Sequence, residues 1–402
     1  MTSLLDSLNN EICWNDFLES KENSKNLPQK VVKEYQEYIN NKKYMEIANG
    51  IIDGSYKFSI PRKVLISKSG KNKKRTVYIY AEKENYILKM ISHLLYKYDN
   101  IFSPNLYSFR KKNGVKKAIY TITKTRKINE MCAYKVDIKN YFNSINVKKL
   151  LKDLKKDLKD ERLYNLIEEI LLNKRVEYEN KIIIEEKGIM AGVPISAFLA
   201  NYYLKDLDEY FYKNNILYAR YSDDIIVFGN TMEEIEQYQQ TIKQFLNIKE
   251  LSVNEEKEYF YKAKEKFEFL GFSFKNGVID ISNNSFKKIK GKIRRTARGL
   301  RRWMIRKEAT SEITLKAMNR KYNNKFFGKS ENDLTWKYWF FPIINTDKTL
   351  KQIDRYMQEQ QRYVITGVHN KRNFKKVPYE FLKKCNYKSL VNEYHNFRSE
   401  YK

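Results

Sequence analysis

Cysteine and histidine are scarce in this chain of 402 residues, and their scarcity excludes two common kinds of site. The cysteines are far apart in the sequence and odd in number, so they predict neither a disulfide framework nor a zinc site. They are Cys13, Cys132 and Cys385. The histidines are equally scattered, and each is better explained as a structural side chain than as a ligand. They are His93, His369 and His395.

Long apolar runs are also lacking. No apolar signal segment stands at the N-terminus, and the most apolar run, 189–204, is too short to span a bilayer and contains Pro194, Ser196 and Asn201. We therefore expect a cytoplasmic protein without a membrane partner. Internal repeats and low-complexity linkers are absent as well.

Acidic residues are outnumbered by basic ones, 49 to 78, which gives a net charge of +29. Such an excess favours a polyanionic partner and predicts binding that weakens steeply with salt. An anionic membrane surface or a merely solubilising face would also fit. Aromatic residues make up 14% of the chain, with 32 Tyr and 22 Phe. They suit stacking on unpaired bases, although burial in a core is their commoner use.

Two of the acids are adjacent and lie inside an apolar stretch. In Tyr221-Ser222-Asp223-Asp224, apolar residues alternate on both sides, which predicts a β-hairpin with the acids at its tip. Neighbouring carboxylates repel each other, and a divalent cation would remove that cost. Their hard oxygen atoms suit Mg²⁺ or Mn²⁺. Taken alone, the pair could equally be a charged turn.

An upstream acid could complete this set. Asp137 ends an apolar strand pattern and is followed by Tyr141 and Phe142. A two-metal nucleotidyl-transfer site needs acids from at least two segments, so that one cation activates the attacking 3′-hydroxyl and the other neutralises pyrophosphate. Asp137 and the pair at 223–224 could supply them if their strands are neighbours. By itself, Asp137 could be a strand-end or N-cap acid.

Between these acids lies a glycine-rich loop followed by a helix pattern. Gly188, Gly192 and Pro194 predict a bend that allows a close approach. Ser196 has the position of an N-cap for a helix over 196–214, and a further helix is expected over 148–173. Small residues at the start of this helix would let a nucleotide or a template base come close.

These pieces, in this order, resemble the palm motifs of reverse transcriptases. They are Asp137 with Phe142, Gly192-x-Pro194-x-Ser196 with Ala200-Asn201, and Tyr221-x-Asp223-Asp224. The glycine–proline–serine form is closest to the bacterial retron, group II intron and defence-associated enzymes. Further segments are similar to family segments, namely 106–119, 251–257 and a small hairpin at 267–274, so that the resemblance covers roughly 55–307. Intron enzymes have Pro-Gln-Gly where this chain has Met190-Ala191-Gly192, which weakens the intron assignment.

The resemblance implies a role for each matching residue. The metal ligands, for two Mg²⁺ with Mn²⁺ as an alternative, would be Asp137, Ile138, Asp223 and Asp224. Phe142 would be the steric gate that selects deoxynucleotides. The other nucleotide contacts would be Lys68 and Arg75 on the triphosphate, Gly192, Ser196, and Lys257 as a proton donor to pyrophosphate. Arg110, in the Ser-Phe-Arg segment, would contact nucleic acid. Lys68 and Arg75 belong to a predicted basic hairpin in the fingers, for which a solvated basic turn is the alternative.

The segment 285–307 carries eleven basic residues and no acid. Its apolar residues recur every three or four positions, which predicts an amphipathic helix that begins at Ser285. We expect a thumb helix whose charged face follows the nucleic-acid backbone; membrane-surface and protein-binding helices are the alternatives. The expected phosphate contacts are Lys287, Lys288, Arg294, Arg295, Arg298, Arg301 and Arg302.

The predicted fold is α+β, a right-hand polymerase with fingers and an antiparallel palm sheet, followed by a helical thumb. The expected domains are an N-terminal helical extension (1–54), fingers and palm (55–284), and a thumb with a C-terminal helical region (285–402). The tail, 308–402, resembles the C-terminal helical region of some defence-associated bacterial reverse transcriptases. The predicted function is an RNA-directed DNA polymerase that uses dNTPs to copy a structured noncoding RNA into DNA in antiphage defence. A retron enzyme primed by an RNA 2′-hydroxyl, priming by a tyrosine, and an inactive RNA-binding protein are the alternatives. A homo-oligomer is left open.

Overall fold

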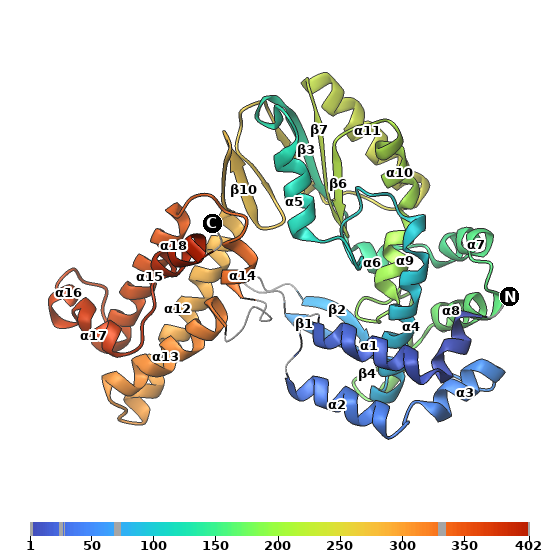
Figure 1. Ribbon diagram of the computed structural model, residues 1–402, viewed down its shortest axis with the longest axis horizontal. Helices are drawn as coiled ribbons and strands as arrows, with labels where there is room; N and C mark the ends of the chain where they lie inside the picture. Colours follow the sequence, from blue (N-terminus) through green and yellow to red (C-terminus); the bar gives the residue numbers. More distant parts are fainter. Residues whose placement is uncertain (1–2, 24–26, 28, 68–73, 329–334, 401–402) are drawn as a thin grey trace. The chain divides into compact units, whose positions relative to one another are not determined.

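The computed structural model describes residues 3–23, 27, 29–67, 74–328 and 335–400. They form two compact units, Met1–Glu265 and Lys266–Lys402, each of which is described by itself (Figure 1). The predicted domain boundaries after residues 54 and 284 stay predictions. Lys68 lies outside the described residues. Within the described ranges, no helix is both long and apolar enough to cross a membrane.

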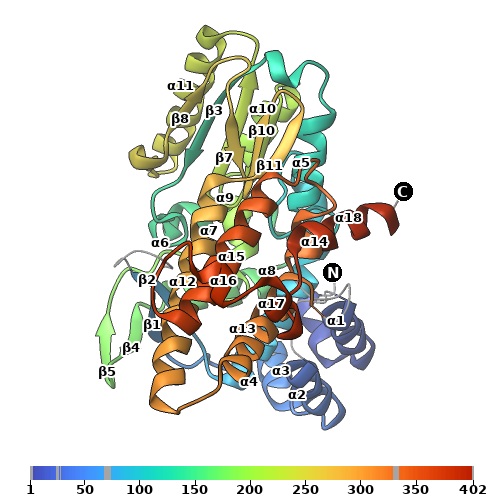
Figure 2. The same cartoon turned by 90° about the vertical axis from the view of Figure 1, so that its left-hand side faces the viewer.

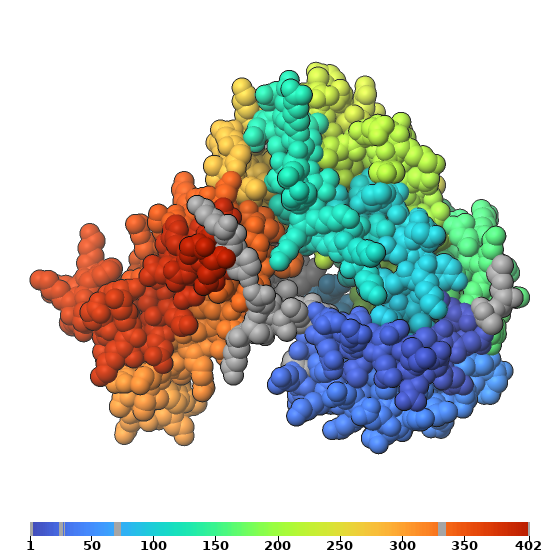
Figure 3. Space-filling model, in the orientation of Figure 1, coloured from blue at the N-terminus to red at the C-terminus, as the bar shows by residue number. Residues whose placement is uncertain are grey.

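The first unit begins with four helices, as predicted for residues 1–54. They are η1 (Leu4–Asn9), α1 (Glu11–Asn23), α2 (Gln29–Asn40) and α3 (Met45–Asp53). Trp14 is fully buried, stacks on Tyr44 at 4.6 Å between ring centroids, and donates its indole N–H to the Leu8 carbonyl at 2.8 Å. These helices share one hydrophobic core with the rest of the unit, and Figure 3 shows them (blue) against the cyan surface that includes α4 (Glu82–Leu94).

A mixed sheet with strand order β2-β1-β4-β5 follows the helices. Its strands are β1 (Arg62–Ser67), β2 (Lys74–Ile79), β4 (Arg175–Tyr178) and β5 (Lys181–Ile184). The antiparallel pairing of β1 with β2 confirms the basic hairpin predicted there. Beyond β2 come α4, η2 (Leu95–Ile101), α5 (Val115–Lys124) and η3 (Ile128–Glu130).

The second sheet is antiparallel throughout, with strand order β6-β7-β3-β8. Its strands are β3 (Cys132–Asp137), β6 (Tyr218–Tyr221), β7 (Asp224–Gly229) and β8 (Tyr259–Tyr261). Helix α11 (Met232–Ile248) runs along β3 and β7, as both views show (Figures 1 and 2). Helices beside an antiparallel sheet confirm the predicted α+β class. Between β7 and β8, η4 spans Glu255–Lys257.

Two long helices predicted in this unit are each divided into two. The segment 148–173 forms α7 (Val147–Asp157) and α8 (Glu161–Leu172), because the Asp160 carboxylate accepts from the Leu163 N–H at 3.1 Å and starts a new helix. The segment 196–214 forms α9 (Ser196–Tyr203) and α10 (Lys205–Lys213), because Leu204 leaves helical geometry with φ −114°. Apolar periodicity continues across both breaks, so it could not reveal them.

The second unit contains a small antiparallel sheet and seven helices among its described residues. Its strands, in the order β11-β10-β9, are β9 (Phe267–Phe269), β10 (Phe272–Lys275) and β11 (Val278–Ile281), and they confirm the predicted hairpin at 267–274. The helices are α12 (Asn283–Arg306), α13 (Ser311–Phe326), α14 (Trp336–Phe340), α15 (Lys348–Thr366), α16 (Asn373–Lys376), α17 (Tyr379–Lys384) and α18 (Leu390–Glu400). The predicted helical tail is confirmed.

Helix α12 is the basic amphipathic helix that the sequence predicts. Ile289, Ile293 and Ala297 are buried on its inner side, where it packs against α13 and α15. Its start was predicted wrongly, since the cap is Ser282, whose hydroxyl accepts from the Ser285 N–H at 3.1 Å. The hydroxyl can do so because Ser282 keeps an extended backbone, whereas Ser285 is already helical.

Candidate active site

Three carboxylates meet at one end of the antiparallel sheet. Asp137 is the last residue of β3 and lies opposite Asp224, the first residue of β7. Asp223 lies in the two-residue turn between β6 and β7, and its carbonyl accepts from the Ile138 N–H at 2.9 Å. The pairing register therefore places all three acids on adjacent strand ends, although Asp137 is more than eighty residues away in the sequence.

Burial and the repulsion of neighbouring carboxylates make Asp223 and Asp224 hard to ionise. Burial, with the charges of Asp137 and Asp223, raises the pKa of Asp224 to about 6, although Lys135 opposes the shift. Burial and the Asp137 charge likewise raise the pKa of Asp223. A site that disfavours its own negative charge is suited to a cation.

Two lysines partly neutralise the site. Lys135 Nζ lies 3.5 Å from Asp224 Oδ1, and Lys257 Nζ lies 2.5 Å from Asp137 Oδ2. Burial lowers the pKa of Lys257, but its hydrogen bond to Asp137 and the three carboxylate charges outweigh burial and raise the pKa. Lys257 therefore carries its proton at neutral pH.

The donor atoms present fit a divalent cation. Asp224 Oδ1 is buried and has the Lys135 ammonium group 3.5 Å away, but it accepts no hydrogen bond of good geometry within the described part of the chain, so its hard oxygen could serve a cation. Among the described residues, no three Asp, Glu, His or Cys side chains are positioned so that together they could hold a metal ion. Lys257 pairs with Asp137, so a cation would take over the position of this ammonium group.

Phe142 and the glycine loop are joined through backbone contacts. Phe142 is half-buried in α6 (Tyr141–Ser144), and its carbonyl accepts from the Ile189 N–H at 2.9 Å. A Cβ atom on Gly188 would lie 2.3 Å from that carbonyl oxygen, so only glycine fits there. The predicted close approach is therefore made to the Phe142 backbone within the protein.

The same loop also reaches the strand that carries Arg75. The Tyr78 N–H donates to the Ala191 carbonyl at 2.8 Å, and Gly192, at φ 105°, lies against the backbone of Tyr78. Arg75 is exposed on β2, and its positive charge is one of those that partly offset the raised pKa of Asp223. The loop thus connects Phe142 to the basic hairpin.

Ser196 does not cap α9, contrary to the prediction. It is buried as the first residue of the helix, and its hydroxyl donates to the carbonyls of Ile189 and, at 2.9 Å, Met190. Those bonds fold the glycine loop back on the helix and leave the hydroxyl already engaged. Its predicted nucleotide contact stays a prediction.

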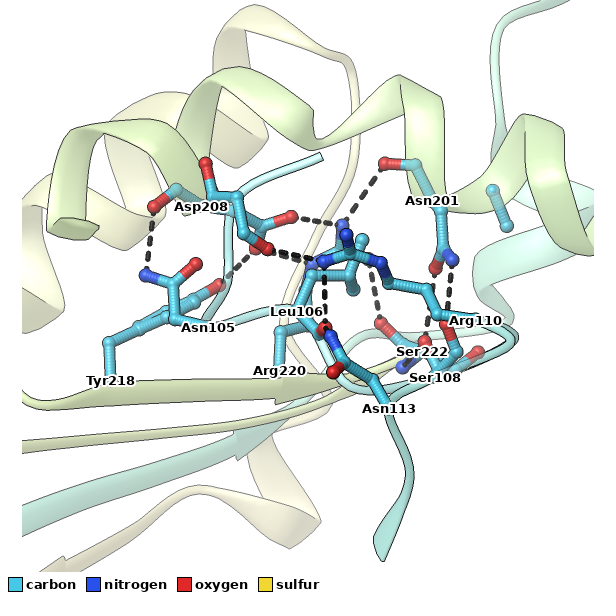
Figure 4. Close-up of polar contacts among 12 residues, drawn as sticks. Asn105, Leu106, Ser108, Arg110, Asn113, Asn201, Asp208, Tyr218, Arg220 and Ser222 are labelled. Atoms are coloured by element: carbon cyan, nitrogen blue, oxygen red, sulfur yellow. Dashed lines mark hydrogen bonds and ion pairs between the residues drawn. The ribbon is translucent and has the colours of Figure 1, made fainter. Parts of the chain in front are cut away.

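A buried ion pair lies beneath the hairpin that carries Asp223 and Asp224 (Figure 4). Arg220 and Asp208 are both fully buried, and the guanidinium binds both carboxylate oxygens, through Nε at 2.7 Å and Nη2 at 2.5 Å. Burial opposes the Arg220 charge, but Asp208 outweighs burial and raises the pKa of Arg220. The arginine also donates to the carbonyls of Asn201, at 3.1 Å, and Ser222, at 3.2 Å.

The turn residue Ser222 is held from two directions. Its φ of 61° is left-handed, which costs a non-glycine residue about 1–2 kcal/mol. Its N–H donates to Ser108 Oγ at 2.8 Å, and its carbonyl accepts from Arg220. Ser108 in turn exchanges two hydrogen bonds with Asn201, at 2.8 and 3.0 Å. We call Ser108, Asn201, Asp208, Arg220 and Ser222 the hairpin clamp.

Comparison with known proteins decides the family. The model of the family "Reverse transcriptase (RNA-dependent DNA polymerase)" matches residues 66–274, more than half of the chain. This chain belongs to the reverse transcriptases. The matched segment contains both the acids and the hairpin clamp. No curated relative matches the sequence.

Solved structures of telomerases are also similar to the enzyme. The apo telomerase of Candida tropicalis, truncated from its C-terminal domain, has 14% identity and a TM-score of 0.45; the match covers 56% of this chain and 55% of that one. The Candida albicans telomerase, in complex with a TWJ fragment of telomeric RNA, has 12% identity and a TM-score of 0.45, and covers 90% and 70%. This chain therefore spans about half the length of the Candida tropicalis telomerase.

Two arginines predicted to bind nucleic acid are engaged within the enzyme. Arg110 uses every guanidinium N–H on Asp99, Ser103 and Leu106, with both Asp99 carboxylate oxygens at 2.9 Å. Arg301 donates from Nη1 to the carbonyls of Val364 and Ile365, at 2.9 and 3.0 Å, at the end of α15. Their predicted contacts with nucleic acid stay predictions. The other predicted contacts of α12 are exposed; they are Lys287, Lys288, Arg294, Arg295, Arg298 and Arg302.

Sequence reasoning missed most of the hairpin clamp. Arg220 lies among apolar residues, which is the pattern expected of a buried charge with a partner, whereas Asp208 is flanked by Asp206 and Glu209 and gives no such signal. Lys135 carries the same kind of signal in β3. The sequence could therefore have indicated that these charges are partnered, although not which partner each has.

Proposed function

We propose that this reverse transcriptase copies a structured noncoding RNA into DNA at Asp137, Asp223 and Asp224, with two Mg²⁺ ions bound there. The observation that carries the proposal is the register of β3 against β7, in which Asp137 faces Asp224 beside Asp223. Bound cations would supply activation of the primer 3′-hydroxyl and neutralisation of the leaving pyrophosphate. The Ile138 backbone next to Asp137 completes the proposed ligand set.

The residues around the acids take the remaining roles in this proposal. Arg75 binds the triphosphate of the incoming nucleotide, with Lys68 as its partner in the same hairpin. Lys257 holds Asp137 until cations bind, and its retained proton is then available to pyrophosphate. The exposed basic residues of α12 contact the phosphates of the template and product, as part of a thumb over 285–402 that follows fingers and palm over 55–284.

The template and the biological role are proposed from the motif resemblance. The Gly192-x-Pro194-x-Ser196 form is closest to bacterial enzymes, and the helical tail after α12 is like that of defence-associated members. We therefore place the enzyme in antiphage defence. In the second candidate, a retron enzyme, the primer is a 2′-hydroxyl of its own RNA, and the same active site would serve it.

Primer extension on an RNA template tests the site. Asp223→Asn and Asp137→Asn should each lower kcat about 10³-fold or more, a loss of at least ~4 kcal/mol in transition-state stabilisation, while RNA affinity is retained. The matched control is Asp280→Asn, an acid in β11 of the other unit. Extension at wild-type rates by both variants would refute the assignment of these acids.

Sequencing the nucleic acid that copurifies with the enzyme from its host tests the template. A cDNA complementary to one folded RNA supports the main proposal. A branched molecule that joins DNA to an RNA 2′-oxygen supports the retron alternative, whereas repeated or homopolymer cDNA supports the defence-associated class.

Sugar selection tests Phe142. Phe142→Val should admit ribonucleotides, because the smaller side chain leaves space for a 2′-hydroxyl. The measurement is the ratio of kcat/KM for a dNTP to that for the matching rNTP, which we expect to fall at least about tenfold, or ~1.4 kcal/mol. An unchanged ratio would remove the gate role.

A further inference from the structure

One large aromatic side chain next to the acids has no part in the assignments above. Phe109 leaves 44% of its surface exposed, although it belongs to the unit with the larger described core. Its ring centroid lies 6.4 Å from the ring of Phe142 and 6.4 Å from the ring of Tyr221. We call Phe109, Phe142 and Tyr221 the aromatic corner.

The members of the aromatic corner come from three separate segments that converge on the acids. Phe142 follows Asp137 by five residues, and Tyr221 precedes Asp223 by two. Phe109 comes from the loop before α5 and meets the Phe142 ring nearly edge-on, at an interplanar angle of 89°. An apolar surface therefore lies beside the carboxylates, within reach of a nucleotide whose phosphates are bound there.

The backbone of Phe109 is held in an unfavourable conformation. Its φ is 53°, in the left-handed region that costs a residue with a side chain free energy. An exposed phenylalanine gains little from burial that could offset this cost, so the conformation must be imposed by its neighbours. Strain of this kind gathers at functional sites, where the surrounding structure fixes a side chain in one direction.

Both neighbours of Phe109 are fixed (Figure 4). Ser108 is fully buried and bound to Asn201 and Ser222 of the hairpin clamp. Arg110 uses all its guanidinium N–H groups on Asp99, Ser103 and Leu106. Phe109 is thus a projecting residue between two anchored ones, and the clamp that holds the acid hairpin also holds this residue.

From this geometry we propose that Phe109 packs against the base of the incoming deoxynucleotide and so lowers its KM. The proposal rests on the proposed function, since it needs the triphosphate to bind at Asp137, Asp223 and Asp224. Every base has an aromatic face, so this contact is independent of base identity. The role of Phe109 differs from that of Phe142, which is assigned to the sugar.

Steady-state primer extension with each dNTP tests the proposal. Phe109→Ala should raise the KM for all four dNTPs about fivefold or more, with the RNA dissociation constant and the melting temperature unchanged. Phe109→Trp should keep a KM near that of the wild type, and Phe109→Ala should not admit ribonucleotides. The matched control is Phe374→Ala in α16, which removes an exposed phenylalanine (54%) remote in sequence from the motifs and should leave KM unchanged.

Three results would overturn the proposal: a KM for Phe109→Ala equal to that of the wild type, a rise of the same size in Phe374→Ala, or weaker RNA binding with an unchanged KM. The last would assign Phe109 to the template strand. Asp223→Asn is measured alongside. If that variant is inactive while Phe109→Ala is normal, only the Phe109 proposal fails; if Asp223→Asn is active, the proposed function fails first.

The imposed conformation has its own test. Phe109→Gly should melt at a higher temperature than Phe109→Ala, because glycine adopts φ 53° without strain, while both variants lose the ring and show the same raised KM. Equal melting temperatures would contradict a strained Phe109.

Discussion

The charged residues at and beneath the β6–β7 hairpin, which carries Asp223 and Asp224, are buried or half-buried, whereas most of those on helix α12 are exposed to water. Beneath the hairpin, Arg220 and Asp208 are fully buried and bound to each other, and the nearby Asp224 has a raised pKa because it is buried too. On α12, the basic residues that were predicted to bind phosphate are exposed, apart from Arg301. A charged group that is removed from water must have a partner of opposite charge, whereas an exposed charge needs none because water solvates it.

This difference predicts two kinds of response to mutation. Removing one member of a buried hydrogen-bonded network leaves its partners without a hydrogen bond or a counter-charge. Single substitutions there should therefore have large effects. Exposed charges act through a shared electrostatic field, so single substitutions on α12 should have small effects that accumulate.

The largest effect on stability is expected at Asp208. Asp208→Asn leaves the buried guanidinium of Arg220 without its counter-charge and should lower the free energy of unfolding by about 3–5 kcal/mol. Arg302→Gln, an exposed charge on α12, should change it by no more than about 0.5 kcal/mol. Urea unfolding measures both, and similar values for the two variants would break the comparison.

A double variant shows whether the pair serves stability or geometry. Replacing both charges, as Asp208→Leu with Arg220→Met, should recover part of the stability that Asp208→Asn removes. It should not recover kcat, because methionine cannot donate to the Ser222 carbonyl as Arg220 does. Full recovery of kcat would show that the clamp does not position the acids.

A smaller effect, of opposite sign, is expected at Asp224. Its pKa in the folded state is about 6, against an ordinary value of 3.8, so the folded protein binds this proton more tightly than the unfolded chain does. The stabilisation that the folded protein gains from the proton on Asp224 is complete below about pH 4, and it disappears as the pH rises through 6. Above pH 6 the ionised carboxylate costs folding up to about 3 kcal/mol.

Asp224→Asn removes that cost. Without divalent cations the variant should therefore be more stable than the wild type at pH 7.5, with a difference that shrinks towards pH 4. Thermal unfolding across this pH range measures it. Adding Mg²⁺ should stabilise the wild type more than the variant, because a cation that binds only the folded state shifts the unfolding equilibrium. A variant that is less stable at pH 7.5 would contradict burial as the cause.

The smallest effects per residue are expected on α12. Neutralising Arg294, Arg295 and Arg298 to Gln should weaken RNA binding in steps, and the slope of log affinity against log salt should shrink by about 0.7–0.9 for each phosphate that the protein no longer neutralises. Lys375→Gln with Lys376→Gln on α16 is the control of equal exposure. An equal weakening in the control would mean that net charge, and not this helix, sets affinity.

Local patterns were enough to predict the elements that carry the site. Alternating residues predicted the hairpin around Asp223 and Asp224, and three- and four-residue spacing predicted α12, because both patterns reflect one face packed against a core. The meeting of Asp137 with that hairpin was inferred from the order of motifs. Spacing alone leaves the strand pairing open.

What the sequence could not show is the partner of each charge. Arg110 and Arg301 were assigned to phosphate because a formal charge is visible in a sequence, whereas the acceptors that engage them are not. The carbonyls that bind Arg301 lie more than sixty residues away. The strained backbone at Phe109 and Ser222 is likewise set by tertiary contacts. Neither residue type predicts a left-handed φ.

The burial of Trp14 has a practical consequence. The chain has four tryptophans, and the other three, Trp303, Trp336 and Trp339, all belong to the second unit. An enzyme in which those three are phenylalanine would emit only from an indole enclosed between Leu8 and Tyr44. Its fluorescence would follow the melting of the first unit alone.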